Sequence, residues 1–204
     1  MLHAPIPAAE AASLPLGSSA PPAASILAAA ERILSHLEQG STVDAAMLRS
    51  AMDDAFGASD TAGAWDWKAA YDACEVATVL FLRKYGKPLF RKAGPPASRL
   101  SALTKIVGLL PTHTRRSEEA QVLQQFSTPI PLGLAALTAA ILTPADRVLE
   151  PSAGTGLLGV LAETAGASLI LNELAETRAD LLTSLFPATP VTRFDAAQID
   201  DHLD

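Results

Sequence analysis

Three acidic residues and two glycines have the types and spacing of a ligand-binding turn. Glu150, Glu173 and Asp195 each follow a short apolar segment, and Gly154 and Gly156 come soon after the first of them. Glycines let a ligand approach the backbone closely, and a helix that begins after such a turn offers unpaired N–H groups. This pattern is typical of a nucleotide-like ligand at the carboxyl ends of parallel strands.

A dinucleotide site is the rival interpretation, because Gly154, Gly156 and Gly159 form a G-x-G-x-x-G pattern. The carboxylate of Glu150, which Pro151 follows, argues against it. A pyrophosphate beside this carboxylate would be repelled, whereas an ammonium group would be attracted. We therefore expect a ligand that carries a positive charge near the turn.

The other two carboxylates discriminate less between ligands. Glu173 can accept hydrogen bonds from ribose hydroxyls, which both kinds of ligand possess, and Asp195 can accept one from an exocyclic amine of adenine. Each of them could instead be a solvated helix cap, and the glycines could simply make a tight turn between a strand and a helix. Carboxylates at three strand ends favour the ligand site.

An alternation of strands and helices is predicted for the last third of the chain. The expected strands are 147–150, 168–172 and 191–194, and the expected helices between them are 155–165 and 175–186. The order β-α-β-α-β predicts an α/β fold with a parallel sheet and crossover helices.

A helical region is predicted before this sheet. Apolar residues at helical spacing indicate helices over 25–39, 43–56, 61–85, 97–109, 117–124 and 131–142. Ser41 or Thr42 is the expected cap of the second helix. Gly86 and Pro88 are expected to interrupt helical structure after the third helix. The expected divisions are a disordered Ala/Pro-rich tail (1–24), a helical region (25–116) and the sheet region (117–204).

The runs Gln124-Gln125-Phe126-Ser127-Thr128-Pro129 and Leu149-Glu150-Pro151-Ser152-Ala153-Gly154-Thr155-Gly156 resemble motifs X and I of amino-methylating DNA methyltransferases of the adenine-N6 type. More narrowly, residues 124–204 are similar to the N-terminal methylase region of bacterial methylase–helicase proteins, also called strawberry-notch-like.

The resemblance implies the first three strands of a Rossmann-like class I methyltransferase sheet that binds S-adenosylmethionine (AdoMet). It also implies DNA as the substrate and a helicase domain in the same polypeptide. The implied cofactor contacts are Phe126 and Thr128 at the methionine end, Glu150 with Pro151, Gly154 and Gly156 around its amino acid portion, Glu173 at the ribose and Asp195 at the adenine.

One element of this family is missing from the sequence. The family transfers the methyl group with an (Asn/Asp)-Pro-Pro-(Tyr/Phe) tetrapeptide after the fourth strand, and no such tetrapeptide occurs here. We therefore assign no catalytic residue and expect a truncated domain that does not methylate by itself. Two alternatives stay open: a non-catalytic nucleic-acid-binding module on the same scaffold, and a dehydrogenase-like NAD protein.

A basic segment interrupts an acidic chain. The net charge is −7, yet residues 83–116 contain nine Lys or Arg and no Asp or Glu, while the rest has 6 basic and 22 acidic residues. This split predicts contact with DNA or RNA phosphates; the alternative is a solvated face that pairs with acidic neighbours. The residues expected to contact nucleic acid are Arg83, Lys84, Lys87, Arg91, Lys92, Arg115 and Arg116.

The composition argues against a protein with internal disulfides, a metal site or a membrane-spanning helix. Cys74 is the single cysteine, so no internal disulfide can form, and no Cys/His spacing resembles a metal site. The longest apolar run, 132–142, is shorter than the roughly 20 residues that a membrane-spanning helix needs. We expect a cytoplasmic protein without a metal or a membrane partner.

Overall fold

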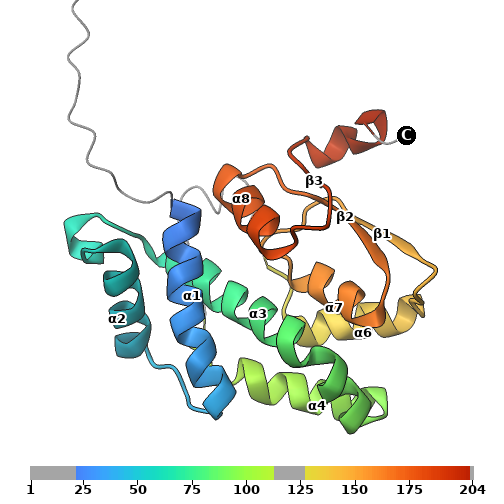
Figure 1. Cartoon of the computed structure of the whole chain (residues 1–204), viewed down its shortest axis with the longest axis horizontal. Helices are drawn as coiled ribbons and strands as arrows, with labels where there is room; N and C mark the ends of the chain where they lie inside the picture. The colour runs from blue at the N-terminus through green and yellow to red at the C-terminus, as the bar shows by residue number, and fades with distance from the viewer. Residues whose placement is uncertain (1–21, 113–126, 203–204) are drawn as a thin grey trace, which may run out of the picture.

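Helices make up the first half of the structure, a computed structural model that describes residues 22–112 and 127–202 (Figure 1). The elements of this half are α1 (Pro22–Gln39), α2 (Ala45–Phe56), the 3-10 turn η1 (Asp60–Ala62), α3 (Trp67–Ala93) and α4 (Pro96–Val107). Helix α1 buries Ile26, Ala30, Ile33 and Leu37 on one face, as their spacing predicts. Residues 22–24 belong to α1, so their assignment to a disordered tail was wrong.

The second helix begins later than predicted, because a different residue caps it. Asp44, and not Ser41 or Thr42, is the N-cap: its Oδ1 accepts hydrogen bonds from the backbone N–H groups of Ala46 and Met47 at 2.9 and 2.8 Å. A carboxylate accepts hydrogen bonds from the unpaired N–H groups of the first turn, and its negative charge interacts favourably with the positive end of the helix dipole.

Helix α3 corrects two sequence predictions. It begins at Trp67, where the side chain of Asp66 accepts a hydrogen bond from the N–H of Ala69, and it continues through Gly86 and Pro88 to Ala93. Gly86 is a packing position, because a β-carbon there would lie 3.1 Å from Oγ1 of Thr164. The prediction of an irregular chain after residue 85 was therefore wrong.

A three-stranded parallel sheet occupies the other half of the structure. Its elements are α6 (Ile130–Ala140), β1 (Arg147–Glu150), α7 (Leu157–Ala165), β2 (Ser168–Asn172), α8 (Glu176–Leu185), β3 (Val191–Thr192) and η2 (Ala196–His202). The strand order is β1-β2-β3, with Leu149 opposite Ile170 and Leu171 opposite Val191. The parallel sheet is confirmed, and its combination with helices is compatible with the predicted α/β class, although β3 is shorter than predicted.

One hydrophobic core joins the two halves. Helix α3 packs against α7, α1 packs against α8, and α6 packs against both α4 and α7. Figure 1 shows α3 extending from the helical part toward the sheet. The helices that precede the sheet therefore help to build the surroundings of its carboxyl edge. Within the described ranges, no helix combines the length and apolar character needed to cross a membrane.

Candidate functional site

The turn after β1 is shaped by two glycines with positive φ. Gly154 has φ +57° and Gly156 has φ +94°, conformations that side chains disfavour. The turn is fixed to the next strand, because the N–H of Ala153 donates to the carbonyl of Asn172 at 2.8 Å. A rigid glycine turn thus lies at the carboxyl end of the sheet, where the sequence predicts it.

The two glycines have different functions in this turn. A β-carbon on Gly156 would lie 2.5 Å from Cε2 of Phe186, so this glycine leaves room for the Phe186 ring, which follows α8, against the start of α7. A β-carbon on Gly154 would meet nothing closer than Nη1 of Arg178 at 4.0 Å. Gly154 faces a cavity, whereas Gly156 is not among the residues that line it.

The cavity has a volume of about 460 Å³ and lies at the carboxyl ends of the strands. Of the predicted cofactor contacts, Thr128, Pro151, Gly154, Glu173 and Asp195 line it. These residues come from the segment before α6 and from the ends of all three strands. The volume falls within the range of small-molecule sites. The fold therefore brings together five positions that are spread over 68 residues of sequence.

Glu173 is buried and holds the turn. Its Oε2 accepts a hydrogen bond from the N–H of Gly154, and its Oε1 accepts one from the N–H of Ala175, both at 2.9 Å. Asp195 is exposed, and its Oδ1 accepts from the N–H of Ala197 at 3.0 Å. Asp195 thus makes the capping contact that the sequence allows, whereas Glu173 binds the turn after β1 and the N-cap residue of α8, a helix without a side-chain cap. Both carboxylates line the cavity.

Glu150 lies differently from the other two acidic residues. It is half-buried at the end of β1 and is not among the residues that line the cavity. Burial raises the pKa of Glu150 above its ordinary value, and a hydrogen bond with the backbone of Ser152 acts in the opposite direction. The structure therefore brings two of the three predicted carboxylates to a common cavity. Phe126 lies outside the described residues.

Asn172 holds the strand ends together. This buried amide donates through Nδ2 to the carbonyls of Pro151 and Phe194, both at 2.9 Å. Its Oδ1 accepts from the N–H of Phe194 and from Oγ1 of Thr192, both at 2.8 Å. All hydrogen-bonding positions of the amide are used, which fixes the relative positions of the segments that follow β1 and β3.

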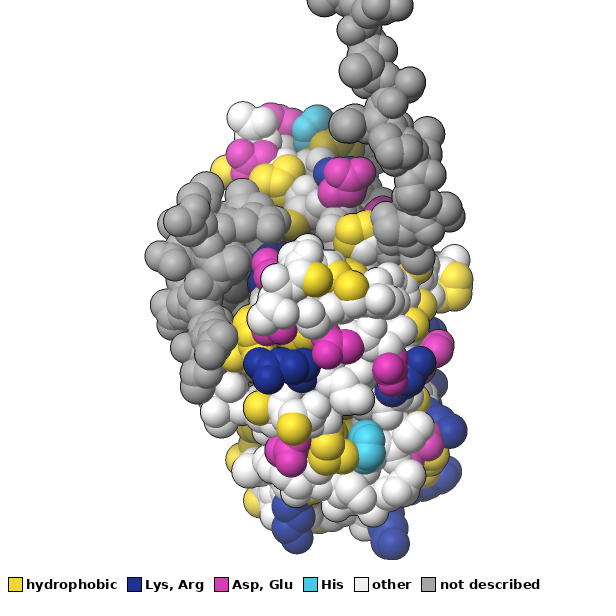
Figure 2. Space-filling model, turned by 90° about the vertical axis from the view of Figure 1, so that its left-hand side faces the viewer, with side chains coloured by type: hydrophobic (Ala, Val, Ile, Leu, Met, Phe, Trp, Pro, Cys, Tyr) yellow, Lys and Arg dark blue, Asp and Glu magenta, His cyan; other side chains and the backbone are white. Residues whose placement is uncertain are grey.

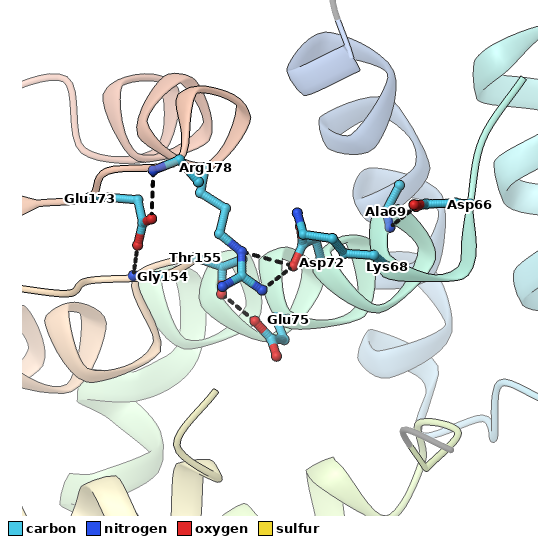
Figure 3. Close-up of polar contacts among 10 residues, drawn as sticks. Asp66, Lys68, Ala69, Asp72, Glu75, Gly154, Thr155, Glu173 and Arg178 are labelled. Carbon is cyan, nitrogen blue, oxygen red and sulfur yellow. Dashed lines mark hydrogen bonds and ion pairs between the residues drawn. The ribbon is translucent and has the colours of Figure 1, made fainter. Parts of the chain in front are cut away.

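A group of buried charged residues from α3 and α8 completes the site, and sequence reasoning did not find it (Figure 3). Arg178 donates to Oδ1 of Asp72 through Nη2 at 2.7 Å and through Nε at 3.2 Å. Oγ1 of Thr155, in the glycine turn, donates to Oε2 of Glu75 at 2.7 Å. The sequence signal for this group of charges is the pair of acidic residues Asp72 and Glu75 within an otherwise apolar stretch of α3.

Glu75 connects three segments of the site. Besides Thr155, it forms a side-chain hydrogen bond with Ser127, which precedes Thr128. Burial raises the pKa of Glu75 above its ordinary value, and the nearby Asp72 carboxylate raises it further, against the opposing effects of Ser127, Thr155 and Arg178. Burial therefore shifts this carboxyl toward its protonated form in the folded chain.

The predicted nucleic-acid contacts fall into two groups. Arg83 forms two hydrogen bonds of 3.0 Å with Glu163, and Lys84 lies 2.7 Å from Glu38, so these two basic residues pair with acidic neighbours. Lys87, Arg91 and Lys92 are exposed near the end of α3, as is Lys105 on α4. We call these four residues the distal basic group.

Within the described residues, no ion pair involves a member of the distal basic group. Figure 2 shows Lys and Arg side chains at the lower end of the molecule, where Figure 1 places α4 and the end of α3. Arg115 and Arg116 lie outside the described residues.

Comparisons with known proteins give no further assignment. No protein-family model matches the chain, and neither a curated protein nor a solved structure matches it. Among the described residues, no group of three or more His, Cys, Asp or Glu is placed to hold a metal ion. Functional inference therefore depends on the site itself.

Proposed function

We propose that this chain is the AdoMet-binding part of a nucleic-acid methyltransferase with a Rossmann-like class I sheet. The observation that carries the proposal is the cavity in which Thr128, Gly154, Glu173 and Asp195 meet. These positions are the ones that the resemblance assigns to the methionine end, the amino acid portion, the ribose and the adenine of the cofactor. The longer protein would be a DNA adenine-N6 methyltransferase that also carries a helicase domain.

The cavity suits this cofactor in size and in polarity. Gly154 presents backbone without a side chain, so a ligand can lie directly against the turn. Glu173 is positioned by two backbone hydrogen bonds, and each of its oxygens has a second lone pair for a ribose hydroxyl. Exposed Asp195 can accept from the exocyclic amine of adenine. Bound AdoMet supplies a methyl group that its sulfonium activates, and the chain contributes binding and orientation.

Calorimetric titration of the full chain tests this proposal. We expect AdoMet to bind and NAD to bind more weakly. Asp195→Asn should weaken AdoMet binding by about tenfold, because one charged hydrogen-bond acceptor is lost. The asparagine can still accept from the N–H of Ala197, so the fold should be unaffected. A matched control is Asp200→Asn, which changes an exposed acid in η2 that does not line the cavity.

Two results would contradict the proposal. One is tighter binding of NAD than of AdoMet, which would favour a dinucleotide protein. The other is no AdoMet binding together with retained DNA binding, which would favour the non-catalytic nucleic-acid module. That second function is supported by the distal basic group on α3 and α4.

A further inference from the structure

Arg178 is a buried cation that the proposed cofactor contacts do not use. It lies in the first turn of α8, is 5% exposed, and crosses to α3, where Nε and Nη2 bind Asp72. Figure 3 shows the side chain reaching from α8 toward Asp72, past Thr155. Two segments that are 106 residues apart in sequence thus fix the position of one guanidinium.

The third nitrogen of this guanidinium is directed at the glycine turn. Nη1 is the atom nearest to the place of a β-carbon on Gly154, at 4.0 Å, and Arg178 lines the cavity. In the described part of the chain, Nε and Nη2 make the hydrogen bonds of this side chain, and Nη1 makes none. A donor in a fixed position therefore faces the part of the cavity where the backbone is bare.

The charge of Arg178 is only partly balanced by Asp72. Asp72 is shared between two cations, because Lys68 Nζ lies 3.3 Å from its Oδ2 while Arg178 binds its Oδ1. The carboxylates of Glu75 and Glu173 also act on Arg178, but the two oxygens of Glu173 are already hydrogen-bonded to backbone N–H groups. Nη1, on a residue that lines the cavity, is thus a charged donor that remains for an anion.

We propose that Arg178 binds an anionic group of the ligand at the glycine turn, through Nη1. This inference rests on the proposed function, under which the anion is the carboxylate of the methionine portion of AdoMet. It revises the electrostatic argument from the sequence, which places an ammonium beside Glu150. A guanidinium also binds phosphate, so a nucleoside diphosphate is the other possible source of the anion.

A series of ligands tests the proposal on the unmodified chain, so the result does not depend on whether a variant folds. Calorimetry would compare AdoMet with decarboxylated AdoMet, which keeps the sulfonium and the ammonium but lacks the carboxylate, and with ADP. We expect loss of the carboxylate to weaken binding by about tenfold. Equal binding of AdoMet and decarboxylated AdoMet, without binding of ADP, would overturn the inference and leave the proposed function intact.

A variant then assigns the effect to the residue. In Arg178→Gln, we expect AdoMet and decarboxylated AdoMet to bind with nearly equal affinity, because the difference between the two ligands is the contribution assigned to Arg178. Arg193→Gln is the matched control, because Arg193 is exposed, pairs with Glu176 and does not line the cavity. Arg178→Lys, which keeps the charge, should retain part of the preference.

The outcomes separate the two proposals. Binding of ADP but not of AdoMet, with the ADP binding lost in Arg178→Gln, would support anion recognition by Arg178 and reject the AdoMet-binding function. A carboxylate preference that survives in Arg178→Gln would reject the assignment to Arg178, even though AdoMet binds.

Discussion

The carboxylate of Glu173 accepts two backbone N–H groups and also lines the cavity. Asp195 does the same with one N–H group. For Asp195, a helix cap and a place at the cavity are alternatives in the sequence, but the geometry makes them compatible. A residue between a parallel strand and the following helix lies at the helix start and at the ligand edge together. These backbone hydrogen bonds hold both carboxylates at the edge of the cavity.

At Gly156 we predict a large loss of stability on substitution by alanine. The positive φ should cost about 1–2 kcal/mol, and the β-carbon at 2.5 Å from Phe186 should add about 1–3 kcal/mol of overpacking. Chemical denaturation of the variant measures the sum.

Gly57→Ala is the matched control for this substitution. Gly57 also has positive φ, at +75°, but a β-carbon there would meet nothing within 4 Å. The control should therefore show the conformational cost alone. Equal destabilisation by the two substitutions would show that Phe186 moves aside and that close packing at Gly156 is unimportant.

Individual site residues differed in how well the sequence predicted them. Gly154, Glu173 and Asp195 were found because each lies beside the end of a strand, which is a local signal. Arg178, Asp72 and Glu75 were missed because their partners are 80 or 106 residues away. A local pattern cannot show which buried carboxyl meets which buried cation.

Whole elements also differed in how well the sequence predicted their bounds. Strands β1 and β2 were predicted with the correct bounds, because each is a short apolar run between turn residues. The end of α3 was placed eight residues too early, because Gly86 and Pro88 are ordinarily helix breakers. Contact with α7 at Gly86 gives that glycine a packing function, and tertiary contacts outweigh the low intrinsic propensity.

The contact of α3 with the glycine turn predicts a pH dependence. Glu75 has a raised pKa in the folded chain, chiefly through burial. Its contribution to stability is fully present below the ordinary glutamate pKa of 4.5 and is lost as the pH rises through the raised value. In Glu75→Gln the amide stays neutral, so we expect the unfolding free energy to fall less between pH 4.5 and pH 8 than in the unmodified chain.

Denaturation curves at several pH values measure this difference. The matched control is Glu31→Gln, which changes an exposed glutamate on α1 and should leave the pH dependence as it is. Parallel curves for Glu75→Gln and the unmodified chain would mean that Glu75 is ionised in the folded chain without a penalty.

At the scale of the whole molecule, the distribution of charge predicts where nucleic acid binds. Replacing Arg91 and Lys92 by glutamine should weaken DNA binding, because two exposed cations near the end of α3 are lost. The slope of log affinity against log salt should decrease by about 0.9 for each phosphate contact removed. Fluorescence anisotropy with a DNA duplex at several salt concentrations measures both quantities.

Arg32→Gln with Arg49→Gln provides the control for this pair, since it changes the net charge equally. Those two arginines lie on α1 and α2 and pair with Asp54 and Asp60. If both double variants lose the same affinity, net charge alone governs binding and the distal basic group is not a specific surface.

The overall arrangement was predicted only in outline. The order of helices and then parallel strands follows from local periodicity, which sequence analysis can detect. The packing of α3 on α7 and of α1 on α8 does not, because side-chain contacts between distant segments determine it. The sequence therefore predicted the carboxyl edge of the sheet, which lines the cavity, but not the hydrogen bonds of α3 with the turn after β1 and with α8.

Through the Asp72–Arg178 pair, binding of the proposed ligand is coupled to the packing of the helical half. If Arg178 must be held by α3 before it can meet an anion, then occupancy of the cavity and docking of α3 strengthen each other by the same factor. Amide protons in α1 and α3 should then exchange more slowly when ligand is bound, although neither backbone lies in the turn. A substitution that loosens α1 from α3 should, reciprocally, lower affinity at a site that it never touches.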